Sequence, residues 1–317
     1  MKLLVCREGV HGYDAADYAA ALRERLPDHE VVHARTRAAE ADELTDARIA
    51  TGPRLDAELL GDADHLELFA CAYAGHDHLP LWALADRDVA VTNAAGVHAP
   101  NVAEHVVGSV LAFERGFREG WRREQRSEWR PYPVGELRGS TVTVVGLGHI
   151  GRAVVERLAP FGVDTIGVRA SPEKGGPTDS VVGPDDLSGA LADTDYLVLA
   201  CPLTDGTRGL VDESALVTLP SDAVVVNVAR GPVVDTDALV SALRRNQVGG
   251  AALDVTDPEP LPPDHPLWTF ENVQVTPHLA GATPRYYERL ADLVAENVER
   301  LAGGRGLRNR VAVAESD

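Results

Sequence analysis

The chain has 317 residues, a hydrophobic content of 44%, and 49 acidic against 30 basic side chains, for a formal net charge of −19. This length suggests about two domains, and the apolar content excludes a wholly disordered chain. The excess of negative charge argues against nucleic acids and anionic membranes as partners, because both are negatively charged themselves.

Acidic residues are spread along the chain, and Lys2 and Lys174 are the only lysines. We expect a salt-accumulating organism, since molar salt screens repulsion among like charges, although an acidic protein of a GC-rich organism is the alternative. The N-terminus lacks the apolar core of a secretory signal, no stretch approaches the roughly 18 apolar residues of a membrane span, and the three cysteines form no C-x-x-C pair. These features predict a cytoplasmic protein with reduced thiols.

The first 98 residues alternate between apolar strands and helices. Helices are expected at 14–26, 56–60 and 79–85, and strands at 2–6, 31–34, 48–51, 66–71 and 89–92. Such alternation is typical of a parallel sheet with helices on both faces. A long amphipathic helix is expected over 99–118 with Asn101 as its cap, followed by an irregular segment over 121–139.

A glycine-rich turn opens the second half of the chain. The apolar β-branched run 142–145 is followed by Gly146, Gly148 and Gly151 in the pattern G-x-G-x-x-G, and then by a helical pattern. In this context the glycines make the tight turn, admit a pyrophosphate to the backbone and let the helix pack on the strand. The pattern therefore predicts dinucleotide binding at the helix N-terminus.

Further strands are expected at 164–168, 196–200, 223–227, 250–253 and 273–276, with helices between them. A last helix over 284–302 is expected to return to the first domain, and the tail from Gly303 to be loosely ordered.

Arg169 stands at the end of the second strand of this half, eighteen residues after Gly151. An acidic residue near this point usually binds the ribose 2′-hydroxyl of NAD, whereas an arginine, with Ser171 and Lys174 nearby, attracts a 2′-phosphate. We therefore expect NADP(H), with NAD(H) as the alternative.

Three polar residues follow the ends of later strands: Arg230 in NVARGPVVD, Glu259 in LDVTDPEPLP and His278 in VTPHLAGAT. Each alone is a weak signal, because loop arginines, turn acids and capping histidines are common. Together a cation, an acid and a histidine at the ligand-binding edge of a parallel sheet suggest carbonyl reduction beside a nicotinamide.

The combined motifs resemble the D-2-hydroxyacid dehydrogenase family, in its glyoxylate/hydroxypyruvate reductase-like branch. They are CAYAGHDHL, APNVAEH, GLGHIG, CPLTDGTRGL, NVARG, LDVTDPEPLP and TPHLAGAT. The resemblance implies an α/β fold of two Rossmann-like domains with parallel sheets. An NADP(H)-binding domain over 99–284 would be inserted in a flavodoxin-like substrate domain over 1–98 and 285–317. Arg169 departs from the family, since many members carry Asp there.

The resemblance also implies a mechanism. His278 would give a proton to the carbonyl oxygen of a small or branched 2-oxo acid, and Glu259 would orient the imidazole and favour its charged form. Arg230 would hold the substrate carboxylate together with backbone N–H groups of Ala74 and Gly75. The product would be a D-2-hydroxy acid.

Cofactor contacts are implied at the three loop glycines, at Arg169 and at His149, Ile150, Ala170, Ser171, Cys201, Pro202, Thr207, Val228, Ala229, Asp254 and Gly281. Asp254 resembles the residue that accepts a hydrogen bond from the nicotinamide carboxamide. We expect no metal, because His76 and His78 have no third ligand near them. The family implies a homodimer, and we expect Trp121 and Trp129 to pack at a dimer contact rather than to stack on a base.

Two other functions stay open. One is another enzyme of similar sequence, above all a phosphoglycerate dehydrogenase-like NAD enzyme, although the chain after Arg285 is too short for the regulatory domain that such enzymes often carry. Formate dehydrogenase is a weaker alternative, because its reaction needs no general acid and the Arg–Glu–His set is intact. The other is a nucleotide-sensing regulator without turnover, against which the filled catalytic positions argue.

Overall fold

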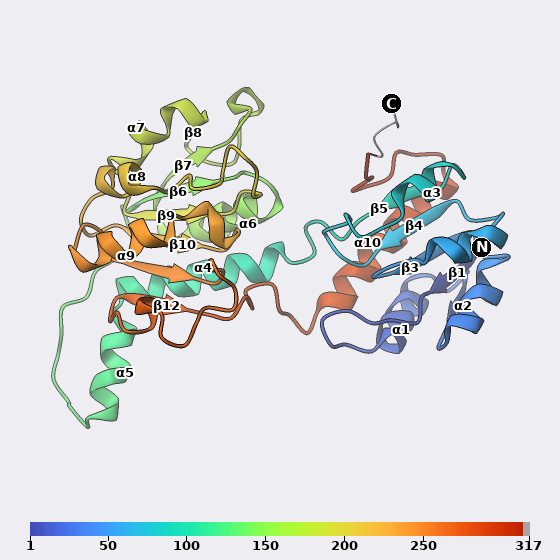
Figure 1. The fold of residues 1–317 in the computed structure, drawn as a ribbon, viewed down its shortest axis with the longest axis horizontal. Coiled ribbons are helices and arrows are strands. Elements are labelled where there is room, and N and C mark those ends of the chain that lie inside the picture. The colour runs from blue at the N-terminus through green and yellow to red at the C-terminus, as the bar shows by residue number, and fades with distance from the viewer. Residues whose placement is uncertain (313–317) are drawn as a thin grey trace. The chain divides into compact units, whose positions relative to one another are not determined.

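The computed structural model describes residues 1–312. It divides into two compact units (Figure 1). One comprises Met1–Val97 with the chain from Ala282 onward, and the other comprises His98–Gly281. Both are built on parallel sheets, so the expected α/β fold with two Rossmann-like sheets is confirmed.

In the first unit, the described residues form a five-stranded sheet of order β2-β1-β3-β4-β5. Its strands are β1 (Lys2–Val5), β2 (Glu30–His33), β3 (Ile49–Gly52), β4 (Leu68–Cys71) and β5 (Ala90–Thr92). Its helices are α1 (Ala15–Arg25), α2 (Arg37–Leu44), α3 (Leu81–Ala85) and α10 (Tyr286–Ala302), with a 3-10 helix at Ala57–Asp62.

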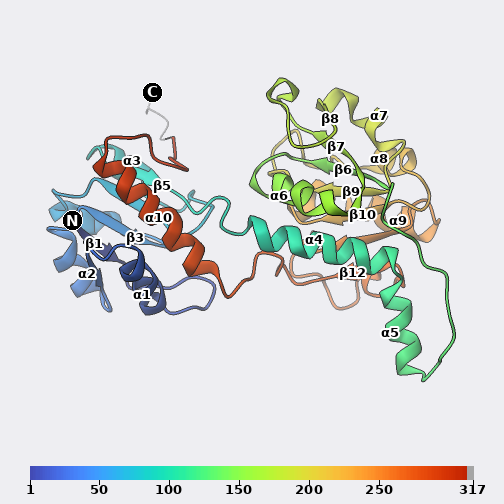
Figure 2. The ribbon, with the colours of Figure 1, turned by 180° about the vertical axis from the view of Figure 1, so that it is seen from behind.

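Alternate side chains of these strands enter two separate cores. Leu3 and Val5 pack with α1 and α10 on one face, whereas Leu4 packs with α2 and α3 on the other. Figure 2 shows α1 and α10 side by side over their face of the sheet. The first strand and the last helix, β1 and α10, thus share one core, because burial on both faces is what a parallel sheet requires.

The second unit contains, within its described residues, a seven-stranded parallel sheet of order β12-β11-β10-β9-β6-β7-β8. Its strands are β6 (Thr141–Val145), β7 (Asp164–Val168), β8 (Ser180–Val182), β9 (Tyr196–Leu199), β10 (Val224–Asn227), β11 (Gly250–Leu253) and β12 (Val273–Val275). Its helices are α4 (Ala99–Glu114), α5 (Phe117–Gln125), α6 (His149–Leu158), α7 (Leu187–Leu191), α8 (Glu213–Thr218) and α9 (Thr236–Arg244).

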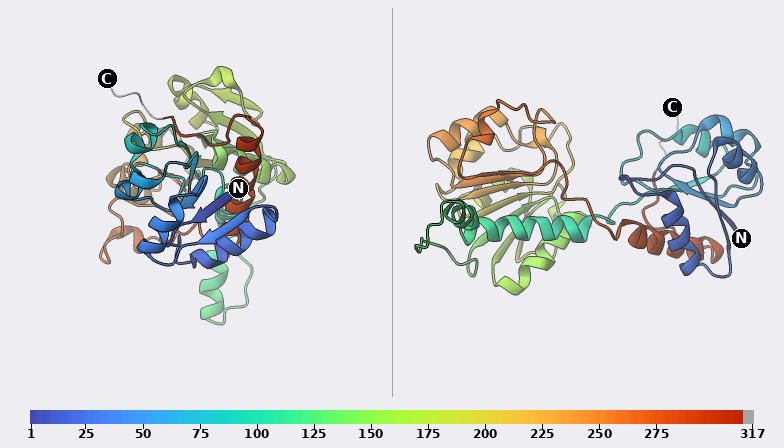
Figure 3. Two further views of the ribbon diagram at one scale, coloured as in Figure 1. Left: turned by 90° about the vertical axis from the view of Figure 1, so that its right-hand side faces the viewer. Right: turned by 90° about the horizontal axis from the view of Figure 1, so that it is seen from below.

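This sheet lies between two helix layers, as the right-hand view of Figure 3 shows. Val102, Val106 and Val110 of α4 recur every four residues and pack with α6 on one face. Helices α8 and α9 contribute to the core on the other face. The strands run in one direction, so their carboxyl ends meet at one edge of the sheet.

Several expected elements were wrong in detail. The helix expected over 99–118 ends at Glu114, because Gly116 adopts a left-handed conformation (φ +60°). A second helix, α5, begins at Phe117 and continues to Gln125, into the segment expected to be irregular. Asn101 does not cap α4; it lies inside the helix, and its Nδ2 donates to the carbonyl of Ala280. Helix α2 and strand β8 were not expected.

The tail is not loose over its described part, because Arg310 bridges to Thr92 and the Val311 N–H donates to Val91 O. Within residues 1–312, no helix combines the length and apolarity that a membrane crossing needs.

Candidate active site

The glycine turn connects β6 to α6 and fits a dinucleotide. A Cβ on Gly146 (φ +96°) would lie 2.7 Å from the Cα of Cys201, and one on Gly151 would lie 1.9 Å from the carbonyl oxygen of Gly146. Both positions therefore require glycine for close packing. A Cβ on Gly148 would have nothing within 4 Å, so internal packing does not explain that glycine, and the open space leaves room for the pyrophosphate predicted there.

The turn lies where the strand order reverses, since β6 has β7 on one side and β9 on the other. Ligands of open α/β sheets bind in the crevice at such a point. Cys201 and Pro202 lie in the loop that follows β9, and Thr207 closes this loop by donating from Oγ1 to Pro202 O over 2.6 Å. Burial raises the pKa of the Cys201 thiol, which argues against a nucleophilic role.

Arg169 follows β7 and is half-buried. Its Nη1 donates to the carbonyl of Gly175 over 2.6 Å, which folds the segment 170–175 beside it. That segment contains Ser171 and the short helix Pro172–Lys174. The three predicted donors for a 2′-phosphate thus lie in one compact loop.

Arg230 follows β10 and is exposed. Asn227, the buried last residue of β10, holds this turn: its Oδ1 accepts from Ala229 N over 3.0 Å, and its Nδ2 donates to Arg230 O over 3.1 Å. Asn227 was not among the predicted site residues, although a polar residue at the end of a buried strand was a usable signal.

Gly231 brings the arginine turn against the loop after β11. A Cβ there would lie 2.0 Å from the carbonyl oxygen of Thr256, so only glycine permits the contact. Thr236 Oγ1 also donates to Asp257 O over 3.1 Å. The loop carrying Glu259 is therefore fastened to the segment that carries Arg230.

His278 lies in the turn after β12, in a left-handed conformation (φ 50°) that costs a non-glycine residue on the order of 1–2 kcal/mol. Its Nδ1 lies 2.6 Å from Glu259 Oε1, and the two side chains are 49% and 42% exposed. Because Glu259 accepts at Nδ1, the opposite ring nitrogen, Nε2, is not used in this contact.

Asp254 follows β11 and is 4% exposed. Its carboxylate accepts hydrogen bonds from backbone N–H groups of Leu279 and Ala280 and from the hydroxyl of Thr276. Thr276 and its neighbour His105 on α4 were not among the predicted site residues. The position of Thr276, two residues before the predicted histidine, was the available signal for that residue. No local pattern indicated His105.

The remaining predicted residues are distributed as follows. Strand ends and the start of α6 carry His149, Ile150, Ala170, Val228 and Ala229, and the peptide oxygen of Gly281 accepts from His98 Nδ1 over 2.6 Å. Ala74 and Gly75 belong to the first unit, in the loop after β4, where Asn93 Nδ2 donates to Ala74 O over 2.7 Å. Their assigned roles stay predictions.

The sequence and fold match known proteins. A family model for the D-isomer specific 2-hydroxyacid dehydrogenase NAD-binding domain matches residues 107–280. A glyoxylate reductase of Thermofilum pendens is 38% identical over 77% of this chain and 74% of its own. The chain belongs to the D-isomer specific 2-hydroxyacid dehydrogenase family. The resemblance noted from the motifs is thereby confirmed.

Similar solved structures extend the match to the first unit. A member from Xanthobacter autotrophicus Py2, in complex with NADPH and MES, is 32% identical with a TM-score of 0.78 over 98% of both chains. An NAD-dependent formate dehydrogenase from Staphylococcus aureus, in complex with NAD, is 28% identical with a TM-score of 0.70 over 99% of both. This chain is accordingly an NAD(P)-dependent oxidoreductase of 2-hydroxy acids, and its relatives include both NADPH and NAD binders.

Proposed function

We propose that this dehydrogenase reduces small 2-oxo acids to D-2-hydroxy acids with NADPH as the preferred hydride donor. The observation that carries the proposal is the 2.6 Å hydrogen bond between His278 Nδ1 and Glu259 Oε1. The carboxylate orients the imidazole, so that Nε2 faces away from Glu259 and can give a proton to a carbonyl oxygen. The reverse proton transfer serves oxidation.

Arg230 complements this pair by binding the substrate. Its exposed guanidinium can hold a carboxylate through two parallel hydrogen bonds and stabilise negative charge on the 2-oxo oxygen. The bound nicotinamide supplies the hydride. The Thermofilum pendens relative is named a glyoxylate reductase, which supports a small 2-oxo acid as substrate.

The preference for NADPH rests on the loop after β7. Arg169, Ser171 and Lys174 offer donors to a 2′-phosphate, and Arg169 occupies the position at which an acidic residue would repel that phosphate. The complex of the Xanthobacter autotrophicus relative with NADPH is in keeping with this choice.

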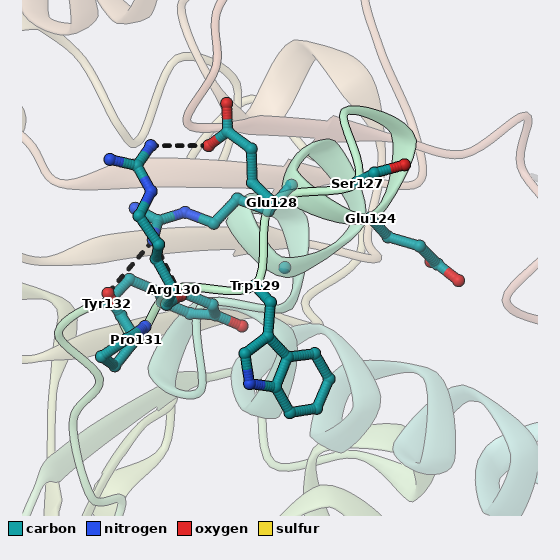
Figure 4. Close-up of a pocket in the computed structure, with 9 residues that line it drawn as sticks. Glu124, Ser127, Glu128, Trp129, Arg130, Pro131 and Tyr132 are labelled. Atoms are coloured by element: carbon teal, nitrogen blue, oxygen red, sulfur yellow. Dashed lines mark hydrogen bonds and ion pairs between the residues drawn. The ribbon is translucent and has the colours of Figure 1, made fainter.

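We also propose that the protein is a homodimer, joined through residues 115–138, which we call the arm. Figure 1 shows α5 and the segment after it extending from the sheet of their unit, and no residue of α5 is buried. Trp121 is 57% and Trp129 100% exposed. In Figure 4 the Trp129 ring stands apart from the Glu128–Arg130 ion pair, beside a hollow of about 720 Å³.

The charge of the arm favours a second copy of the chain as its binding partner. The arm has seven arginines and four glutamates, whereas the whole chain has 30 basic and 49 acidic residues. A basic, aromatic arm is complementary to the acidic surface of another copy, and exposed aromatics with arginine are typical of interface centres.

The test is the oxidation of NADPH and NADH in molar salt with glyoxylate, hydroxypyruvate, pyruvate and branched 2-oxo acids. We expect turnover that is faster with NADPH and that falls by roughly 10²- to 10⁴-fold in His278→Ala, the usual contribution of general acid catalysis. His65→Ala, which changes an exposed histidine of the first unit, is the matched control. Saturable NADPH binding without turnover on any acid would identify a nucleotide-sensing regulator instead.

A further inference from the structure

Asp254 makes more contacts than a cofactor-binding residue requires. It is a buried carboxylate at the end of β11, and Thr276 Oγ1 donates to its Oδ1 over 2.6 Å. The backbone N–H of Leu279 also donates to Oδ1, and that of Ala280 donates to Oδ2, each over 2.9 Å. A buried charge of this kind is tolerated because donors surround it.

All of these donors belong to the turn that carries His278. The His278 N–H itself donates to the backbone carbonyl of Asp254 over 2.8 Å. Three consecutive N–H groups, at 278, 279 and 280, are therefore all accepted by one residue. Since His278 is in the strained left-handed region, the turn needs such contacts to keep its shape.

We propose that Asp254 and Thr276 are positioning residues that set the place of His278 for proton transfer. Asp254 holds the backbone of the turn, and the Thr276 hydroxyl fixes the orientation of the Asp254 carboxylate. The inference rests on the proposed role of His278 as proton donor. It differs from the contact with the nicotinamide carboxamide that the family resemblance implies for Asp254.

The two roles of Asp254 are compatible by the number of acceptor sites. A carboxylate has about four lone-pair sites, and the protein uses three of them, two on Oδ1 and one on Oδ2. The remaining site on Oδ2 suits one amide hydrogen of the cofactor. One carboxylate then fixes the turn of the proton donor and still has a site for the hydride donor.

His105 on α4 extends the same network. Its Nε2 lies 3.3 Å from Thr276 Oγ1, and its side chain is 17% exposed. Because the Thr276 hydroxyl gives its own hydrogen to Asp254, its oxygen accepts from His105. The hydroxyl is thereby held from both sides, so its direction toward Asp254 is fixed.

The test uses Thr276→Val, which removes the hydroxyl. Thr276 itself has no proposed contact with cofactor or substrate. We expect kcat to fall about 10- to 100-fold, because small misplacements of a reacting group have effects of this size. The KM for the 2-oxo acid and the Kd for NADPH stay within about twofold. The solvent deuterium isotope effect on kcat rises as proton transfer becomes slower, and Thr276→Ser restores kcat.

A control variant and a second test variant accompany Thr276→Val. Thr143→Val removes a buried hydroxyl from β6, bonded to Thr194 Oγ1 over 2.6 Å, and leaves kcat and the isotope effect unchanged. Asp254→Asn, which retains shape but loses an acceptor, lowers kcat at least as much as Thr276→Val.

A normal kcat and isotope effect in Thr276→Val, with His278→Ala inactive, would overturn the positioning role alone. Full activity in His278→Ala would overturn the proposed function first. An increase in the Kd for NADPH without loss of kcat in Thr276→Val and Asp254→Asn would assign the network to cofactor binding and also overturn the inference.

Discussion

Arg169 is the residue on which the choice of cofactor depends. Its guanidinium is fixed by the carbonyl of Gly175 and still half-exposed, so it can meet a 2′-phosphate. A hydrogen bond to a charged group contributes about 1.5–3 kcal/mol, and 1.4 kcal/mol is a factor of ten. We therefore expect Arg169→Asp to raise the KM for NADPH roughly 10- to 100-fold and to leave that for NADH within a few fold.

Steady-state kinetics with both cofactors check this prediction. Arg157→Asp is the matched control, because it makes the same charge change in the last turn of α6, where Arg157 pairs with Glu104. An equal loss in both variants would mean that overall charge, and not contact with the 2′-phosphate, governs NADPH binding.

Single residues of the site could be selected from the sequence because strand ends were recognisable. Arg230 and His278 follow apolar runs, and parallel strands place such positions at one edge. The contact between Glu259 and His278 was implied by the family resemblance and not by any local pattern, since it depends on how the loop 254–260 folds. The backbone contact at Gly231 that fastens this loop joins segments 25 residues apart, which no local pattern reveals.

At the scale of elements, the arm is the part whose function is most open to test. We expect the double variant Trp121→Ala, Trp129→Ala to change the solution mass from that of a dimer to that of a monomer, because it removes two large exposed apolar side chains from the proposed contact. Multi-angle light scattering measures this mass. Trp82→Ala, in the first unit and 65% exposed in the same chain, should leave the dimer intact.

A wild-type protein that is monomeric at every concentration would contradict the homodimer. A dimer unaffected by the double variant would retain the assembly and place its contact elsewhere.

Elements were predictable where their hydrophobic pattern was strong, as in β6 and α10, and failed where it was weak. Helix α2 has the polar sequence RAAEADEL with one buried apolar residue, Leu44, so its periodicity is slight. Strand β8 has three residues at the sheet edge. The break between α4 and α5 depends on one left-handed glycine inside a continuing amphipathic pattern, and composition alone does not show which glycine ends a helix.

At the scale of the whole molecule, the negative net charge governs how the stability of the folded state depends on salt. Ion pairs such as Arg48–Glu67, both partners more than 40% exposed, contribute about 0–1 kcal/mol each and weaken as salt rises. The unpaired acidic excess acts in the opposite direction, since its repulsion destabilises the folded state most at low salt. With a formal net charge of −19, we expect repulsion to exceed the attraction of the exposed ion pairs.

This balance predicts that the midpoint of thermal unfolding rises with KCl. The screening length falls from about 10 Å at 0.1 M to about 3 Å at 1 M, so most of the gain should come below about 1 M. For a chain of this size about 1 kcal/mol corresponds to 2–4 °C, and we expect a rise of about 5 °C or more. Circular dichroism against temperature measures it. Exclusion of salt from apolar surface would instead give a steady rise that is larger in sulfate than in chloride, and a midpoint that falls in KCl would show that ion pairs outweigh repulsion.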